Sequence, residues 1–194
     1  SNSSTYPVFV SNNDNAAISY IGNASANSWY GGPLWYSNRS EFYRRKPCAT
    51  FVDALREGMD PRLTTFIRPV DVQLQISAQS PAYIKLADGQ IIRNVPASTP
   101  GVDDINTYRY VGLPPALQNP NLYNLYSSVD FNAIKALNSN IYTDLAANPS
   151  VSYLANMYAE NANPLVKAVL MSFSELNFIL AEARLKNWIS SSTA

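Results

Sequence analysis

The sequence predicts a mainly α-helical fold with long ordered loops and one small antiparallel β-hairpin. The strongest helix signal lies near the end of the chain, where Ser172 and Glu175 have the spacing of a capping box. Alternating apolar residues on either side of Asp88-Gly89 indicate the hairpin, because Asp-Gly is a typical two-residue turn. The loops follow from composition, since the 194 residues include 13 Pro and 13 Tyr and only 14% are charged.

The predicted C-terminal helix follows Ser172, whose hydroxyl can accept a hydrogen bond from an unpaired amide of the first turn. Apolar residues then recur on one face, namely Phe173, Leu176, Leu180 and Ala183. Phe178 and Ile179 widen this face, and the alanines allow another helix to approach closely. We therefore expect a helix that is covered by other helices rather than surrounded by water.

Three regions divide the chain, which we interpret as a single domain over 1–194 or a fragment of a larger protein. Residues 1–48 are loop-rich and aromatic, with no sustained periodicity. Residues 49–127 combine short helices with the hairpin and loops, and residues 128–194 are expected to be helical. The polar start, and an end that follows a strong helix directly, favour a trimmed fragment.

Two short helices are predicted at the start of the middle region. Thr50 and Asp53 have the spacing of a capping box, which indicates a helix over about 50–57. Asp60-Pro61 is typical of a helix start, so Arg62 to Ile67 is expected to form a second short helix.

A small antiparallel sheet should follow, because Val72, Leu74 and Ile76 alternate with polar residues and 83–95 has the pattern of a hairpin. Prolines interrupt residues 96–120, which should form an ordered connection. Ser128 then caps a predicted helix whose apolar face consists of Phe131, Ile134 and Leu137. A further helix is expected over Tyr142 to Ala147.

Composition excludes several classes of function. The 14 basic and 14 acidic residues cancel, and Arg44-Arg45-Lys46, interpreted as a surface turn, is the sole basic run, so we expect no nucleic-acid partner. The absence of histidine excludes Ser-His-Asp and Cys-His nucleophile systems and His-ligated zinc. The lone Cys48 is interpreted as a half-buried small apolar residue rather than a reactive thiol. No cofactor, metal site or catalytic residue is assigned.

Two weaker patterns leave alternatives open. Asp103-Asp104 with Asn106 has oxygen ligands suited to calcium, but such a pair after Pro-Gly more often caps a turn. A glycoside hydrolase needs two facing carboxylates, and Glu41 with Asp103 or Asp104 is compatible with that requirement.

Three segments together resemble the SusD/RagB family of outer-membrane lipoproteins. They are Asp60-Pro-Arg-Leu63, Tyr110-Val-Gly-Leu-Pro114, and Ala168 to Ala183 followed by Asn187-Trp188-Ile189. The resemblance covers about 39–189 and is similar to the latter-middle portion of the family, where the Ser-Glu-x-x-Phe-x-x-Ala-Glu-Ala helix belongs to a tetratricopeptide-like unit. It implies a SusD-like fold containing part of that helical unit.

The resemblance also implies a function. Members of the family bind a nutrient, usually a glycan, at the surface of a Gram-negative bacterium and deliver it to a SusC-like TonB-dependent outer-membrane transporter. They are not enzymes. Their lipid-bearing N-terminal cysteine and first helical repeats are missing from this sequence, so membrane association is expected only through an anchor that the chain lacks.

A candidate glycan site comes from the residues themselves. Rigid aromatic rings on a Gly31-Gly32 loop offer flat apolar platforms for sugar C–H faces, and nearby polar side chains can bind hydroxyls. The candidate ligand-binding residues are Trp29, Tyr30, Trp35, Tyr36, Tyr43, Asn38 and Arg39. The alternative is that these rings fill a small core beneath a loop.

Three functions are therefore carried forward from the sequence. The first is non-catalytic glycan binding, and the second is a glycoside hydrolase that uses only carboxylates. The third is a helical interaction scaffold without a sugar site, which a large apolar patch around Phe178 or Ile179 would favour.

Overall fold

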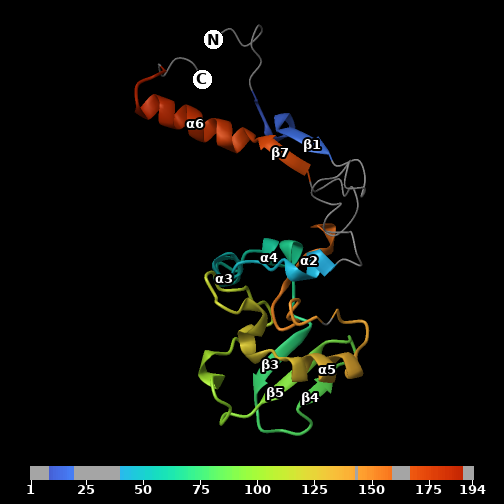
Figure 1. Ribbon diagram of the computed structural model, residues 1–194. Coiled ribbons are helices and arrows are strands. Elements are labelled where there is room, and N and C mark those ends of the chain that lie inside the picture. Colours follow the sequence, from blue (N-terminus) through green and yellow to red (C-terminus); the bar gives the residue numbers. More distant parts are fainter. Residues whose placement is uncertain (1–8, 20–39, 143, 159–166, 190–194) are drawn as a thin grey trace.

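A computed structural model describes residues 9–19, 40–142, 144–158 and 167–189. These residues form five α-helices and seven β-strands arranged in three separate sheets, so the prediction of a mainly α-helical fold is wrong (Figure 1). Much of the described chain is irregular, and many of its regular elements are short strands or 3-10 helices. A few strong helix patterns therefore outweighed many weaker strand signals in the sequence interpretation.

The largest sheet has three strands, β3 (Val72–Ile76), β4 (Tyr83–Lys85) and β5 (Ile91–Val95), in the order β3-β5-β4. Strands β4 and β5 form the predicted antiparallel hairpin, and Gly89 in its turn has a φ of 88°, a left-handed conformation that favours glycine. Strand β3 pairs with β5 in parallel, in the register Val72 opposite Ile91. The sheet is therefore mixed rather than antiparallel throughout.

Helix α5 (Ser128–Leu137) lies beside this sheet (Figure 1). The main core cluster consists of Val72, Ile91, Tyr126, Ile134 and Ile141. A second cluster consists of Leu74, Val95 and Val102. The cap is Ser127 rather than the predicted Ser128, and Leu137 is exposed while Ile134 is buried.

Helices α3 (Ala49–Glu57) and α4 (Arg62–Phe66) agree with their predicted positions. The predicted capping box of α3 does not form, because the cap residue is Cys48 and its side chain does not bond to the first turn. The backbone of Leu113 takes that role: its carbonyl accepts from Ala49 N at 2.9 Å, and its amide donates to the carbonyl of Pro47 at 2.8 Å. A Cβ on Gly112 would lie 2.4 Å from Ala49 Cα, so the approach requires glycine. Cys48 is exposed, so the expectation of a half-buried position is wrong.

Shorter elements complete this part of the molecule. Helix α2 (Ser40–Arg44) precedes α3, and strand β2 (Ile67–Arg68) pairs antiparallel with β6 (Tyr153–Leu154). The 3-10 helices are η1 (Asn12–Asp14), η2 (Val102–Asp104), η3 (Pro120–Leu125) and η4 (Asn156–Tyr158). The helix predicted over 142–147 is not present in the described residues of that segment, where Asp144 Oδ1 instead accepts from Ala146 N in a turn.

A separate unit combines strand β1 (Ala16–Ser19), strand β7 (Lys167–Met171) and helix α6 (Phe173–Leu185), drawn at the top of Figure 1. The predicted capping box is confirmed: Glu175 N donates to Ser172 Oγ at 3.0 Å, and Ser172 N donates to the Glu175 carboxylate. Asn15 Oδ1 also accepts from Phe173 N at 2.7 Å.

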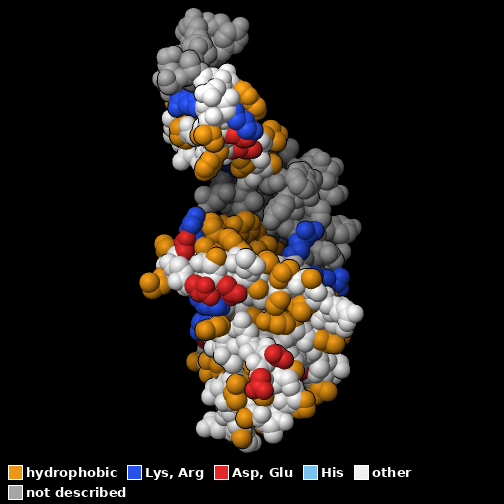
Figure 2. All heavy atoms as spheres, turned by 90° about the vertical axis from the view of Figure 1, so that its left-hand side faces the viewer, with side chains coloured by type: hydrophobic (Ala, Val, Ile, Leu, Met, Phe, Trp, Pro, Cys, Tyr) orange, Lys and Arg blue, Asp and Glu red, His pale blue; other side chains and the backbone are white. Residues whose placement is uncertain are grey.

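The expectation of a covered C-terminal helix is wrong for this chain. No residue of α6 is buried, and Phe178 keeps 77% of its side chain exposed. The described neighbours of α6 are few, so its apolar face meets solvent, and Figure 2 shows hydrophobic side chains at the surface of this upper part. In the part of the chain that is described, no helix is long and apolar enough to cross a bilayer.

Candidate functional site

The candidate residues from the sequence are only partly placed by the structure. Trp29, Tyr30, Trp35, Tyr36, Asn38 and Arg39 lie outside the described residues. Tyr43 is described and lines a cleft of about 240 Å³. The aromatic loop thus stays a prediction, and the cleft beside Tyr43 is the site that can be analysed.

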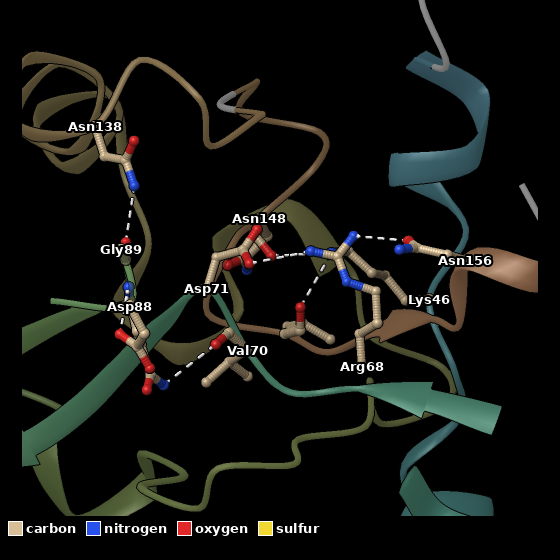
Figure 3. A network of polar contacts seen from close by, with 11 residues as sticks. Lys46, Arg68, Val70, Asp71, Asp88, Gly89, Asn138, Asn148 and Asn156 are labelled. Atoms are coloured by element: carbon tan, nitrogen blue, oxygen red, sulfur yellow. Dashed lines mark hydrogen bonds and ion pairs between the residues drawn. The ribbon is translucent and has the colours of Figure 1, made fainter. Parts of the chain in front are cut away.

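The cleft lies between the segment that joins β2 to β3, the β4–β5 turn and the loop after α5. Its lining consists of Tyr43, Arg68, Pro69, Val70, Asp71, Asp88, Gly89, Gln90, Arg109, Asn138, Asn140, Ile141 and Tyr142. Most of these side chains are polar and planar, with two tyrosine rings among them. Figure 3 shows how several of them are tied to one another.

Two stacked rings form the aromatic part of the cleft. The rings of Tyr43 and Tyr142 lie 4.5 Å apart at an interplanar angle of 10°. Tyr43 also meets the ring of Tyr153 edge-on at 5.4 Å and that of Phe42 at 5.6 Å. Because Phe42 and Tyr153 are buried, Tyr43 is held in a fixed orientation by the core behind it.

An ion pair lies beside the rings. Arg68 reaches between Asn156 and Asp71 (Figure 3): its Nη1 donates to Asn156 Oδ1 at 3.4 Å, and its Nη2 lies 3.5 Å from Asp71 Oδ1. Burial raises the pKa of Asp71, and the positive charges of Arg68 and Lys46 oppose that rise. The pair therefore presents a fixed guanidinium and a fixed carboxylate to the cleft.

Lys46 lies behind this ion pair. Its Nζ donates to the carbonyls of Asn148 and Val151, both at 3.1 Å, and lies 3.4 Å from the centroid of the Tyr153 ring. Burial lowers the pKa of Lys46 well below its ordinary value. The interpretation of the basic run as a surface turn is thus wrong for Lys46, which helps to hold the cleft wall.

The opposite wall is held by amide side chains. Gln90 is buried; its Nε2 donates to the carbonyl of Val70 at 3.3 Å and its Oε1 accepts from Arg109 Nη1 at 3.2 Å. Asn138 Nδ2 donates to the carbonyl of Gly89 at 2.8 Å. Within the described chain Arg109 has no carboxylate partner, so its guanidinium is oriented by Gln90 and open to a ligand.

This arrangement is suited to binding a small polar ligand that also has apolar faces. Guanidinium, carboxylate and amide groups are planar and can bond two neighbouring hydroxyls, while the tyrosine rings offer apolar surface.

The acidic pair that the sequence offered as a possible calcium or catalytic site lies outside the cleft. Asp103 and Asp104 are exposed in η2, and no cluster of His, Cys, Asp or Glu suited to a metal occurs among the described residues.

Sequence reasoning missed most of the cleft. Asp71 carried a weak signal, because it is a charged residue between Val70 and Val72 at the start of a buried strand. Asn138 and Asn140 lie between two helices predicted from the sequence, in a short segment to which the sequence patterns assign no role. No pattern in the sequence indicated that Arg109 and Tyr142 would meet at this cleft.

Comparisons with known proteins bear on the family. Residues 2–89 match the model of a SusD-like family described as "Starch-binding associating with outer membrane". That range includes Asp60-Pro-Arg-Leu63 but not the C-terminal helix motif. The description names binding, in agreement with the expectation that the chain is not an enzyme. Among curated proteins, none matches the chain.

Two solved structures are similar to this chain. A chitin-binding protein is 16% identical with a TM-score of 0.50, and the match covers 95% of this chain and 28% of that protein. A SusD-like protein from Bacteroidetes is 20% identical with a TM-score of 0.38, over 95% of this chain and 37% of that protein. The chain thus spans about a third or less of these structures, and the first likeness concerns the fold alone. The predicted resemblance to the SusD/RagB family is confirmed by the family model over residues 2–89.

Proposed function

We propose that this SusD-like chain is part of a non-catalytic cell-surface protein that binds a glycan in the cleft beside Tyr43. The observation that supports this most is the stacked pair of Tyr43 and Tyr142 within a ring of planar polar side chains. A sugar ring has hydroxyls around its rim and apolar C–H groups on its faces, so it needs both kinds of contact.

The polar groups of the cleft are oriented before a ligand arrives. Asp71 is paired with Arg68, Gln90 with Arg109 and the backbone of Val70, and Asn138 with the β4–β5 turn. Little side-chain entropy is therefore lost when a ligand binds, which favours affinity in a small site. The same contacts leave Arg109 with donors available to sugar hydroxyls.

Delivery of the glycan to a SusC-like TonB-dependent transporter is a further part of the proposal. It is supported by the matched family, whose description places it in association with the outer membrane. Attachment through a lipid anchor belongs to the same part of the proposal. The aromatic loop with Trp29, Tyr30, Trp35 and Tyr36 is proposed as a second contact surface for the glycan.

An interaction scaffold is the second candidate function. The exposed apolar side chains of α6 and of the residues that follow it favour this function, since Phe178, Leu185 and Trp188 are 77%, 84% and 71% exposed. A protein partner that covers these side chains would bury apolar area without any sugar site. This candidate predicts no retention of the chain by any glycan.

The test is native electrophoresis through gels that contain a panel of polysaccharides, including starch. The variant Arg109→Ala removes an exposed cleft donor whose described contact is Gln90, so the fold should survive. Arg62→Ala is the matched control, because Arg62 at the start of α4 is also exposed and pairs with Asp60, and neither residue lines the cleft. Tyr43→Ala, Trp29→Ala and Trp35→Ala complete the set, and circular dichroism confirms folding.

Retardation that is lost in Arg109→Ala and Tyr43→Ala and kept in Arg62→Ala supports the cleft as the site. Loss only in Trp29→Ala or Trp35→Ala would move the site to the aromatic loop. An unretarded wild-type chain in every gel would contradict glycan binding by this chain and favour the scaffold.

A further inference from the structure

A second hollow adjoins the cleft. It has a volume of about 370 Å³ and is lined by Ser128, Phe131, Tyr142, Asp144 and Leu145. Tyr142 lines both hollows, so a ligand seated on the tyrosine pair can continue into the second one. The two hollows adjoin at Tyr142 and have different linings, and together they are called the groove.

The second hollow is the more apolar of the two. Phe131 packs against the main core cluster and is half-buried, while Leu145 is 39% exposed. Neither leucine nor phenylalanine can form a hydrogen bond with a sugar hydroxyl. The lining thus suits a small apolar substituent rather than a bare sugar ring.

The polar groups at this hollow are few. The Asp144 carboxylate is already engaged, because Oδ2 accepts from Arg44 Nη2 at 3.0 Å and Oδ1 accepts from Ala146 N at 2.9 Å. The hydroxyl of Ser128 makes no hydrogen bond within the described chain and lies at the start of α5. One available hydroxyl beside an apolar surface matches an amide or ester group, which has one carbonyl oxygen and a methyl group.

We propose that the groove binds an acylated glycan, with a sugar ring against Tyr43 and Tyr142 and its acetyl or similar acyl group in the hollow formed by Phe131 and Leu145. This inference rests on the proposed glycan binding and names the class of glycan. The acyl methyl packs on Leu145, and the Ser128 hydroxyl donates to the acyl carbonyl. Burial of one methyl group corresponds to about fourfold in affinity, and a neutral hydrogen bond at the weak end of its range, as expected for the exposed Ser128 hydroxyl, raises this to about tenfold.

The test compares glycans that differ in the acyl group. Chitohexaose and cellohexaose share the β-1,4 linkage and differ at C2, where one has an acetamido group and the other a hydroxyl. Acetylated and chemically deacetylated xylan form a second pair. Titration calorimetry with the hexasaccharides and affinity gels with the xylans measure the preference.

The variant Leu145→Ser removes the apolar wall of the hollow. Leu137→Ser is its matched control, because Leu137 is 38% exposed, nearly as much as Leu145, and does not line the hollow. In the wild type we expect the acylated member of a pair to bind about four- to tenfold more tightly. Leu145→Ser should reduce the preference about fourfold, because only the Ser128 hydrogen bond to the acyl carbonyl remains, and Leu137→Ser should keep the full preference.

Equal wild-type affinity for both members would overturn the acyl site and leave glycan binding intact. A preference that is undiminished in Leu145→Ser would also overturn it. If starch or another unacylated glycan retards the chain while no acylated glycan binds, the acyl inference fails and the proposed function stands. If no glycan binds at all, both fail.

Discussion

Two regions of the molecule differ in how far their side chains are buried. One is the body around sheet β3-β5-β4, and the other is the unit formed by β1, β7 and α6. In the body, Ile134 of α5 is fully buried in a cluster with Val72 and Ile91. In the other unit, α6 has a complete capping box and no buried residue. A helix can therefore be well specified locally and still contribute little to a core.

The same contrast applies to charge. The body buries Asp130, which accepts a hydrogen bond from Tyr83 Oη and lies 3.0 Å from Arg93 Nη2. The ion pair of α6, Lys186 with Glu182 at 2.6 Å, is exposed to water. Exposed pairs contribute little to stability, whereas a buried charge that loses its partner is costly. Four predictions test how far the two regions differ.

The largest effect is expected for Asp130→Ala. The change removes the acceptor of the half-buried Tyr83 hydroxyl and of Ser127 Oγ. It also leaves the largely buried Arg93 guanidinium without its carboxylate, so that the Leu125 carbonyl remains as its acceptor. We expect the free energy of unfolding to fall by about 3–5 kcal/mol, as measured by chemical denaturation. Glu182→Ala in α6 is the control and should change it by no more than about 0.5 kcal/mol. Similar losses in the two variants would remove the contrast between the regions.

The next effect concerns apolar side chains in the two helices. Ile134→Ala should lower the free energy of unfolding by about 2–5 kcal/mol, because it leaves a cavity between α5 and the sheet. Phe178→Ala removes a larger side chain that is 77% exposed and should cost no more than about 0.5 kcal/mol. A large loss for Phe178→Ala would show that α6 is covered in solution by this chain or by a second copy.

The sequence could predict α6, the β4–β5 hairpin and α3, because the signals for these elements are local. Ser172 with Glu175, Asp88-Gly89 and the pattern over 50–57 each operate within one turn or hairpin. The parallel pairing of β3 with β5 could not be predicted, because it depends on where the intervening β4 lies. The prominence of the C-terminal helix also made the fold look more helical than it is.

The cleft could not be predicted for a related reason. Tyr43 was a candidate residue, but its stacking partner Tyr142 is far away in the sequence, and so are the carbonyls that bury Lys46. A basic run is usually exposed, and only long-range contacts show that one member of this run is not. The cleft is assembled by tertiary packing, whereas its individual side chains carry ordinary surface signals.

A third prediction concerns pH and Lys46, which is half-buried. Burial lowers the pKa of Lys46 in the folded state below the value of 10.5 that applies to the unfolded chain. Between these two pKa values the unfolded state binds one more proton, so the free energy of unfolding falls as pH decreases from 10.5 toward the folded-state value. The slope from this group is at most about 1.4 kcal/mol per pH unit.

The variant Lys46→Met isolates the contribution of Lys46. Tyrosines with raised pKa values, such as Tyr153, titrate in both wild type and variant, so their contributions cancel in the difference. The difference in unfolding free energy between wild type and variant should change with pH between about 7 and 10. Lys135→Met, at an exposed position of α5, is the control and should show no such change. A pH-independent difference for Lys46→Met would mean that Lys46 is solvated in solution.

The smallest effect is expected for Ser172→Ala. The change removes the cap of α6 and should destabilise that helix by about 1 kcal/mol. Because α6 has no buried residue, hydrogen exchange should accelerate in α6 while the amides of β3 and β5 keep their protection. Equal acceleration in both places would mean that the two regions unfold together.

The most direct test of the account is an NMR titration of the isotope-labelled chain with a glycan that retards it in gels. We expect the amide shifts of the described residues to be concentrated in the segments that line the cleft, 68–71, 88–90 and 138–142, and to be small in α6. Shifts confined to α6 or to the β1–β7 pair would contradict the account. They would make the exposed apolar unit, rather than the cleft beside Tyr43, the ligand-binding part of this chain.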